Sequence, residues 1–336
     1  MTTGSVGKPR VYLGVGMPPH VRAWIDAACE VEEYAGGGRA PREALVEALP
    51  RVVGLLTSNQ VRIDNDLIAA NPQLVVVSNV GVGYDNVDIP FATAHGLLVC
   101  NTPDVLTDAV ADLTYGFIIA LARRIVDAHQ FIHAGSWQPG RPMQMGVDIR
   151  GKTLGILGFG RIGHAVARRA APFGLRPIYY DPVRDPKAED EGLAEYAERE
   201  QVLREADFLT VHVFLDEATR GHIGAEDFAL MKPSAFFINT SRGPVLRQRD
   251  LAEALRTGQI AGAALDVFER EPIARDEELL SAPNLIVSPH IGSNTVETRQ
   301  AMNERAGRNL IAAVTGGVPE AMVNPEALAI RRELVG

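Results

Sequence analysis

Short apolar runs alternate with helical patterns along the first hundred residues. The runs are rich in Val, Ile and Leu, and the segments between them carry apolar residues at helical spacing. The expected strands are Arg10–Val15, Val52–Leu56, Leu74–Ser78 and Leu97–Val99. The expected helices are Pro19–Cys29, Arg42–Ala48 and Asp64–Ala70. Strands that alternate with helices in this way predict a parallel sheet, because parallel strands need long crossover connections.

A second alternating series begins after residue 150 and predicts a second parallel sheet, about six strands wide. Its expected strands are Leu154–Leu157, Arg176–Tyr180, Phe208–His212, Ala235–Asn239, Gly262–Leu265 and Leu285–Ser288. Two long helices are expected as well, Thr107–Ile125 and Val296–Val314. The first is apolar on nearly every side, so we expect it to be buried between domains or between subunits.

Length and composition narrow the class of protein. A chain of 336 residues exceeds the size at which one hydrophobic core keeps growing, so two domains are expected. With 46% hydrophobic and 22% charged residues the composition is that of an ordinary globular protein. The net charge of −9 disfavours nucleic acid and anionic membranes as partners, because both attract clustered Lys and Arg. A small anionic substrate remains compatible with it, since a pocket can be locally basic.

The two cysteines, Cys29 and Cys100, are too few for a disulfide framework or a zinc cluster. Both have apolar neighbours, where thiols usually serve as packing residues, so we expect them to be reduced and expect no metal site. Residues 1–10 lack the apolar core of a secretory leader, and the longest apolar stretch, Tyr115–Ala122, is too short to cross a bilayer. We therefore expect a cytoplasmic protein.

A glycine motif follows the expected strand Leu154–Leu157. Gly158, Gly160 and Gly163 lie at the spacing of the dinucleotide fingerprint and open a helix. The first glycine makes a tight turn, the second lets backbone N–H groups approach a pyrophosphate, and the third packs the helix against the strand. Strand, glycines, helix and second strand together predict an NAD site, with Arg161 and Ile162 in its first helical turn.

Asp181 ends the second strand of this unit. A carboxylate at that position can accept both ribose hydroxyls of NAD and would repel the 2′-phosphate of NADP, so NAD is favoured. Arg184 keeps NADP open as the less favoured cofactor, because an Arg near this position can hold the 2′-phosphate. Alternatively, an Asp before Pro182 could simply begin a turn.

Arg242, Glu271 and His290 each follow a different strand of the second sheet. Ligands of doubly wound sheets bind at the carboxyl ends of the strands. His290 can exchange a proton near neutral pH, Glu271 can orient it, and Arg242 can hold a carboxylate with two parallel hydrogen bonds. Each residue alone could be structural. Together they fit hydride transfer between NADH and C2 of a small 2-keto acid, with His290 as the acid and base.

Five segments stand in the order found in one enzyme family: Gly81–Asp88, Gly158–Gly163, Asn239–Gly243, Ala264–Pro272 and Pro289–Ser293. On these segments the sequence resembles the D-isomer-specific 2-hydroxyacid dehydrogenases, over nearly all of the chain up to about Asn324. It is most similar to the glyoxylate/hydroxypyruvate reductase and 2-ketogluconate reductase branch. The resemblance implies the same catalytic three residues and reduction of glyoxylate or hydroxypyruvate to a D-2-hydroxy acid.

The resemblance also assigns binding roles. It implies that Val82 and Gly83 donate backbone N–H groups to the substrate carboxylate and that Asp266 holds the nicotinamide carboxamide. We add Thr107, Thr240 and His290 to the expected cofactor contacts. The substrate side chain is expected among the loops that carry Thr57, Ser58 and Met143–Met145, with Ser58 as a substrate contact.

For the fold, the resemblance implies two α/β domains with doubly wound parallel sheets. Residues 1–103 and 296–336 would form a flavodoxin-like substrate domain, and residues 104–295 would form an inserted Rossmann domain for NAD. Family members commonly pair as homodimers through the cofactor domains, which would account for the apolar helix Thr107–Ile125.

Other functions on this fold are disfavoured by single residues. Phosphite oxidisers carry Lys where this chain has Val82, and formate enzymes usually carry Gln where it has Glu271. Phosphoglycerate enzymes often add a C-terminal regulatory domain, whereas this chain stops shortly after Asn324. A corepressor-like scaffold that senses NAD(H) would bind NADH and show little turnover on any 2-keto acid.

Overall fold

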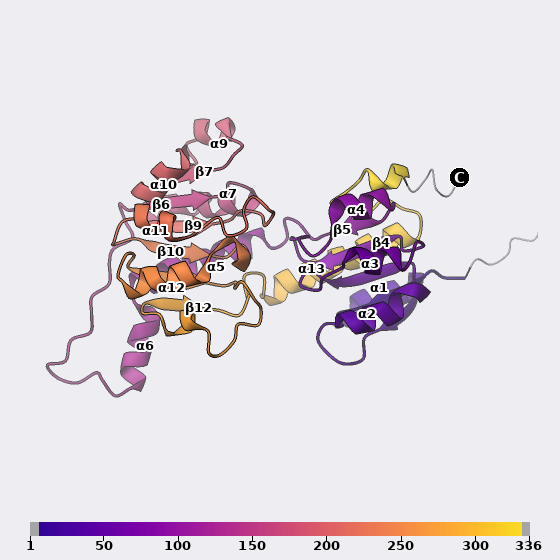
Figure 1. Ribbon diagram of the computed structural model, residues 1–336, viewed down its shortest axis with the longest axis horizontal. Coiled ribbons are helices and arrows are strands. Elements are labelled where there is room, and N and C mark those ends of the chain that lie inside the picture. The colour runs from indigo at the N-terminus through magenta and orange to yellow at the C-terminus, as the bar shows by residue number, and fades with distance from the viewer. Residues whose placement is uncertain (1–6, 331–336) are drawn as a thin grey trace, which may run out of the picture. The chain divides into compact units, whose positions relative to one another are not determined.

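The computed structural model describes residues 7–330, which form two compact units (Figure 1). Within the described range, residues 7–106 and 295–330 make up the first unit, and residues 107–294 make up the second. The chain therefore passes into the second unit after Leu106 and returns to the first at Thr295. No helix in the described range is long and apolar enough to cross a membrane.

The first unit is a parallel sheet with the strand order β2-β1-β3-β4-β5, which is the flavodoxin-like order. Its strands are β1 (Arg10–Leu13), β2 (Glu30–Glu33), β3 (Gly54–Ser58), β4 (Val76–Val80) and β5 (Leu98–Cys100). Its helices are α1 (Pro19–Ala28), α2 (Arg42–Ala48), η1 (Leu49–Arg51), α3 (Asn65–Ala69), α4 (Ile89–Ala94) and α13 (Val296–Val314). Both cysteines lie buried in this unit as free thiols.

Helix α13 lies near the end of the described chain and packs on the sheet of the first unit. The hydroxyl of Ser78 donates to the carbonyl of Ala306 at 2.9 Å, and Asn309 donates to the carbonyl of Asn101 at 3.1 Å. Beyond the helix, the fully buried Asn324 accepts a hydrogen bond from the Val99 N–H at 2.8 Å. The C-terminal segment therefore completes the N-terminal unit.

The second unit has seven parallel strands in the order β12-β11-β10-β9-β6-β7-β8. The strands are β6 (Thr153–Leu157), β7 (Arg176–Tyr180), β8 (Glu195–Tyr196), β9 (Phe208–Val211), β10 (Phe236–Asn239), β11 (Gly262–Leu265) and β12 (Leu285–Val287). The helices are α5 (Thr107–Ala122), α6 (Ile125–His133), α7 (Arg161–Arg168), α8 (Ala170–Phe173), α9 (Pro186–Asp190), α10 (Arg199–Glu205), α11 (Ala225–Leu230), η2 (Gly243–Val245), α12 (Gln248–Arg256) and η3 (Glu278–Ser281). The strand order reverses between β6 and β9, and dinucleotides bind at such a switch point.

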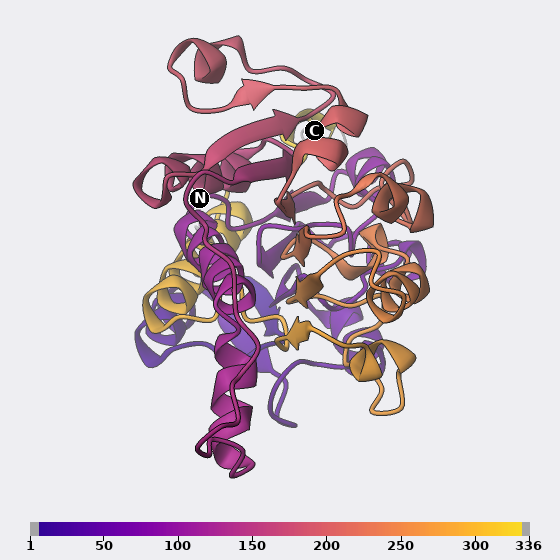
Figure 2. The same ribbon diagram turned by 90° about the vertical axis from the view of Figure 1, so that its left-hand side faces the viewer.

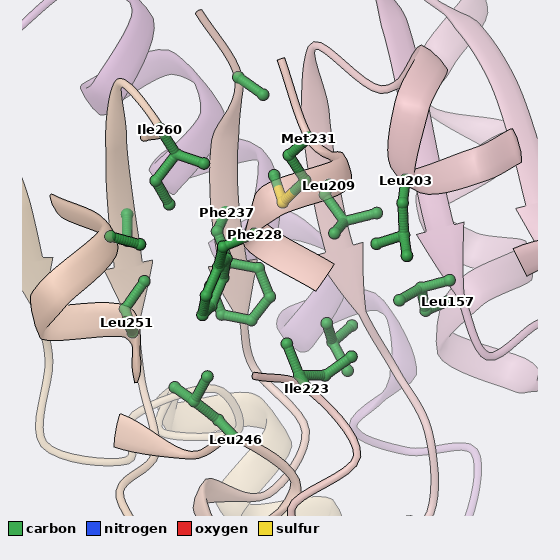
Figure 3. Close-up of a cluster of buried hydrophobic side chains, with 14 of the residues drawn as sticks. Leu157, Leu203, Leu209, Ile223, Phe228, Met231, Phe237, Leu246, Leu251 and Ile260 are labelled. Carbon is green, nitrogen blue, oxygen red and sulfur yellow. The ribbon is translucent and has the colours of Figure 1, made fainter. Parts of the chain in front are cut away.

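Both faces of the seven-stranded sheet are covered, so its strands are continuous apolar runs. Figure 3 shows one face, where Leu203, Phe228 and Leu251 from three helices pack against Leu209 and Phe237 of the strands. The opposite face is covered by α5 and α7. The two doubly wound α/β sheets confirm the predicted fold class.

Two strands were not predicted. Strand β2 is Glu-Val-Glu-Glu and lacks the apolar run that would predict a strand. It lies at the edge of its sheet, where it pairs only with β1 and none of its residues is fully buried. Glu32 instead binds Arg10 at 3.0 Å and Arg51 at 3.2 Å. Strand β8 contains only two residues, too few for a periodic signal, and it brings the second sheet to seven strands instead of about six.

The expected helix Thr107–Ile125 was wrong at its end. Helix α5 stops at Ala122, whose carbonyl accepts a hydrogen bond from the Val147 N–H at 2.8 Å, and Arg124 adopts a left-handed conformation with φ 53°. A separate helix, α6, begins at Ile125. The apolar surface of α5 is buried within its own unit, against α7, β10 and β11. Helix α6 has no buried residue and extends away from the sheet of its unit (Figures 1 and 2).

Candidate active site and cofactor site

The glycine loop lies at the switch point, between the end of β6 and the start of α7. Gly158 has φ 89°, and a Cβ there would lie 2.6 Å from the carbonyl carbon of His212, just after β9. A Cβ on Gly163 would lie 2.4 Å from the Gly158 oxygen. These two positions accept no side chain, because the backbone segments pack directly on one another.

Gly160 differs from both. A Cβ at this position would meet nothing within 4 Å, and the residue is exposed at the N-cap of α7. The first N–H groups of a helix lack partners within it and attract negative charge. Open space in front of a helix N-terminus, framed by two tightly packed glycines, fits a dinucleotide pyrophosphate. Arg161 and Ile162 occupy the first turn of this helix, as expected.

The Asp181 carboxylate faces the glycine loop. Its Oδ2 accepts a hydrogen bond from the Phe159 N–H at 2.8 Å, and its Oδ1 accepts one from the Val183 N–H at 2.9 Å. The side chain therefore forms a turn, and it also joins the end of β7 to the loop. Each oxygen retains a second acceptor direction, which is what two ribose hydroxyls require.

His212 borders the same loop and was not predicted as a site residue. Both of its ring nitrogens are buried and lack a hydrogen-bond partner, which sets it apart among the described histidines. Burial lowers the pKa of His212 to about 3, so its imidazole is neutral. No sequence pattern marks this residue, because an isolated His at a strand end is common.

The loop that carries Arg242 is fixed by a neighbouring amide. Asn239 Oδ1 accepts hydrogen bonds from the N–H and hydroxyl of Ser241 at 2.9 and 2.8 Å, and its Nδ2 donates to the Arg242 carbonyl at 3.1 Å. A Cβ on Gly243 would lie 1.8 Å from the carbonyl of Phe268, so this loop packs directly on the loop after β11. Asn239 has no role in the sequence-based expectation, although an Asn at a strand end is a recognised turn former.

Thr107 and Thr240 lie at the ends of two elements of the second unit. Thr107 begins α5, and Thr240 directly follows β10. The hydroxyl of Thr240 lies 3.2 Å from that of the buried Thr114 on α5.

Glu271 and His290 meet at the carboxyl ends of β11 and β12. Glu271 Oε2 lies 2.7 Å from His290 Nδ1, and Glu271 Oε1 accepts a hydrogen bond from the Phe268 N–H at 3.1 Å. Burial alone would raise the pKa of Glu271. The hydrogen bond and charge of His290, together with the Phe268 N–H and the Arg242 charge, lower it instead. Glu271 is therefore a carboxylate at neutral pH, and the three predicted residues share one edge of the sheet.

Asp266 organises the turn that carries His290. Its Oδ2 accepts from the Gly292 N–H and its Oδ1 from the Ile291 N–H, both at 2.7 Å, and Oδ1 also accepts from the Ser288 hydroxyl. Its backbone carbonyl accepts from the His290 N–H at 2.8 Å. Burial raises the pKa of Asp266, although these donors oppose the shift. The contacts hold His290 in a left-handed conformation, φ 55°, which is uncommon for a residue with a side chain.

Val82, Gly83 and Ser58 belong to the first unit, at the carboxyl ends of β4 and β3. The loop after β4 is held by its carbonyls, since Asn101 donates to the Val82 oxygen at 2.7 Å and the Thr102 N–H donates to Gly81 at 2.9 Å. Among the hydrogen bonds of residues 7–330, none uses the N–H of Val82 or Gly83. Two backbone donors are therefore available at this edge.

Residues 115–292, more than half of the chain, match the family model of the D-isomer specific 2-hydroxyacid dehydrogenase NAD binding domain. The chain belongs to this family. It is thus an NAD-dependent oxidoreductase, and the resemblance inferred from the sequence is confirmed at the level of the family.

Full-length relatives agree with this membership. The chain is 44% identical over 326 residues to a glyoxylate reductase of Thermococcus litoralis, which covers 96% of this chain and 98% of the relative. Among solved structures, the NADPH-dependent glyoxylate/hydroxypyruvate reductase of Sinorhizobium meliloti has a TM-score of 0.85 at 33% identity, covering 96% of this chain and 98% of that one. A glyoxylate reductase of Paecilomyes thermophila has a TM-score of 0.85 at 30% identity, covering 95% and 99%.

Proposed function

We propose that this dehydrogenase reduces a small 2-keto acid, glyoxylate or hydroxypyruvate, to the D-2-hydroxy acid with NADH. The observation that carries the proposal is the 2.7 Å pair between His290 Nδ1 and Glu271 Oε2, at the same sheet edge as Arg242. A proton donor, a carboxylate that orients it and a carboxylate-binding cation are the groups that keto-acid reduction needs. The names of the relatives support the choice of substrate.

The proton is assigned to His290. With Nδ1 hydrogen-bonded to Glu271, Nε2 is the ring atom that would protonate the substrate oxygen. When bound, NADH supplies the hydride that adds to C2 of the keto acid. His290 gives its proton to the carbonyl oxygen and becomes neutral, and the product is the hydroxy acid. Glu271 fixes the ring through the contact with Nδ1.

The substrate carboxylate is assigned to Arg242 and to the N–H groups of Val82 and Gly83, with Ser58 as a further contact. Arg242 already donates one hydrogen bond to the Ser241 carbonyl at 2.9 Å, which fixes part of its guanidinium. Fixed donors stabilise the charge that develops during reduction without reorganising at that moment. The substrate domain, expected as residues 1–103 with 296–336, would then correspond to the first unit, and the NAD domain, expected as residues 104–295, to the second.

The cofactor is assigned to the glycine loop of Gly158, Gly160 and Gly163. Asp181 would bind the ribose hydroxyls and make NADP the less favoured cofactor. Asp266 and His290 would lie near the nicotinamide, and Thr107, Arg161, Ile162 and Thr240 would complete the contacts. The buried carboxylate of Asp266 would serve mainly through the turn it holds.

The same proposal includes a homodimer that forms through the NAD domain. Helix α6 and the segment after it expose Ile132 (58%), Trp137 (77%) and Met145 (89%), a surface that association would bury. Ile132→Asp should shift the mass measured by light scattering toward the monomer, while Val318→Asp, at an exposed position of the other unit, should not. We place the protein in the cytoplasm, where its two buried free thiols would stay reduced.

The decisive experiment is kcat/KM for a panel of 2-keto acids with NADH and NADPH, with phosphite and formate as alternative reductants of NAD. Glyoxylate or hydroxypyruvate should be the best substrate. His290→Ala should lower kcat/KM by about a hundredfold or more, because no other proton donor is assigned there. Arg249→Ala, at an exposed position of α12, is the matched control for Arg242→Ala. NADH binding without turnover on any keto acid would refute the proposal.

A further inference from the structure

The loop after β7, residues 181–185, is fixed on both sides. Asp185 accepts a hydrogen bond at Oδ2 from His164 Nε2 of α7, 2.8 Å away, and its backbone N–H donates to the Tyr179 hydroxyl at 2.8 Å. Asp181 joins the same loop to the glycine loop through the Phe159 N–H. The loop is therefore a defined frame beside the proposed cofactor site.

Arg184 projects from this frame onto two partners. Its Nε donates to Glu189 Oε1 at 3.2 Å and its Nη2 to Glu189 Oε2, a two-pronged ion pair. Its guanidinium carbon also lies 4.5 Å from the centre of the Tyr196 ring, within the range of a cation–π contact. The hydrogen bond to Glu189 raises the pKa of Arg184, and Arg184 lowers the pKa of Glu189, so both are charged at neutral pH.

Glu189 is itself held in place. It lies on α9, and its Oε1 also accepts a hydrogen bond from the buried Tyr179 hydroxyl at 2.9 Å. The Tyr179 hydroxyl in turn accepts from Asp185. The Glu189 carboxylate therefore connects the fixed loop, residues 181–185, to the guanidinium of Arg184.

Arg184 stands three residues after Asp181, the residue assigned to the ribose hydroxyls. A 2′-phosphate on that ribose would need a guanidinium to neutralise it, and an Arg near this position serves NADP enzymes in that way. Here one edge of the guanidinium, formed by Nε and Nη2, is directed to Glu189. NADPH would thus meet a resident carboxylate and an arginine that is already paired.

We propose that Glu189 is a positioning residue for cofactor choice, which keeps Arg184 engaged and so prevents it from binding the 2′-phosphate of NADPH. The proposal rests on the assignment of the cofactor site to Asp181 and the glycine loop. Asp181 would repel the 2′-phosphate, and Glu189 would keep Arg184 from offsetting that repulsion.

The test is Glu189→Gln, which keeps an acceptor for Tyr179 and removes the charge that holds Arg184. With glyoxylate as substrate, kcat/KM for NADPH should rise about fivefold, a modest gain because a partly exposed ion pair is weak. The gain should appear in KM and in the calorimetric Kd for NADPH, with kcat and all NADH parameters unchanged. Glu191→Gln is the matched control, because Glu191 adjoins α9 but pairs with Lys187.

Variants of Arg184 show whether the gain in NADPH use depends on its guanidinium. In Glu189→Gln/Arg184→Ala the NADPH gain should disappear, and Arg184→Ala alone should leave the cofactor preference unchanged. A gain that survives without Arg184, or one that Glu191→Gln matches, overturns the proposal. So does weaker NADPH binding in Arg184→Ala alone, because Arg184 would then already serve the phosphate.

Asp181→Ser separates this proposal from the cofactor site itself. If Asp181→Ser improves NADPH use while Glu189→Gln does not, the role of Glu189 is refuted and the cofactor site stands. If neither substitution changes the use of either cofactor, the assignment of the site to Asp181 fails, and the proposal about Glu189 fails with it.

Discussion

The glycine loop makes opposite predictions for two neighbouring glycines. A Cβ on Gly163 would lie 2.4 Å from the Gly158 oxygen, so Gly163→Ala must push α7 away from the turn after β6. Overpacking of this kind typically costs about 1–3 kcal/mol of folding free energy. A Cβ on Gly160 would meet nothing within 4 Å, and φ −79° there suits an ordinary residue. Gly160→Ala should therefore change the free energy of unfolding by only about 0.5 kcal/mol.

Binding should show the reverse order. The methyl group of Gly160→Ala would occupy the open space assigned to the pyrophosphate, so the Kd for NADH should rise at least about tenfold, which is roughly 1.4 kcal/mol. Urea unfolding followed by circular dichroism gives the stability, and isothermal titration calorimetry gives the Kd. Gly116→Ala is the matched control, because a Cβ there also meets nothing within 4 Å and lies in α5, where Ala stabilises a helix.

Two results would refute this reasoning. If Gly160→Ala binds NADH with the Kd of the unsubstituted protein, the space before α7 does not receive the pyrophosphate. If Gly163→Ala is as stable as the Gly116→Ala control, the contact with Gly158 does not restrict the loop.

Three further predictions concern carboxylates that accept hydrogen bonds from backbone N–H groups. Asp266→Asn places an amide donor against the N–H groups of residues 291 and 292, so the free energy of unfolding measured in urea should fall by about 1–3 kcal/mol. The kcat should fall as well, and an unchanged kcat would contradict the role of this turn. Glu271→Gln keeps the shape but removes the charge beside His290, and kcat for glyoxylate should fall about a hundredfold with little change in stability; a normal kcat would exclude Glu271. The pKa of Asp207 is lowered by the Thr153 N–H and Lys232, against the effect of burial. Asp207→Asn should therefore destabilise the protein fully above about pH 4, and the difference in unfolding free energy should shrink as the pH falls from there through the lowered pKa. A constant difference down to about pH 3 would contradict this.

Much of this site was predictable because its signals are local. The glycine spacing, the acid at the end of β7 and the residues after successive strands are properties of short segments, and parallel sheets bring strand ends together by topology. The turn around His290 was not predictable in the same way. Its conformation depends on Asp266, more than 20 residues earlier, which accepts hydrogen bonds from the N–H groups of Ile291 and Gly292. No sequence pattern marks these backbone donors.

Side-chain partners and helix ends escaped prediction for a related reason. The sequence placed Arg184 near the ribose site, but which carboxylate it binds depends on the position of α9 and β8. The break between α5 and α6 depends on a hydrogen bond from Val147 to Ala122, formed by a chain that returns after 25 residues. An apolar pattern alone continues through that point.

The position of α13 on the N-terminal sheet has a consequence for folding during synthesis. Ser78 donates to the carbonyl of Ala306, which is synthesised 228 residues later. The N-terminal part of the first unit therefore leaves the ribosome before the helix that covers one face of its sheet. The second unit is continuous in sequence and can close its core as soon as Asn294 emerges. Since domains form as units during synthesis, the middle of the chain should fold to completion first. The nascent N-terminal sheet, with the apolar surface around Gly54 that Leu310 and Val314 later cover, is then the part most dependent on chaperones during translation.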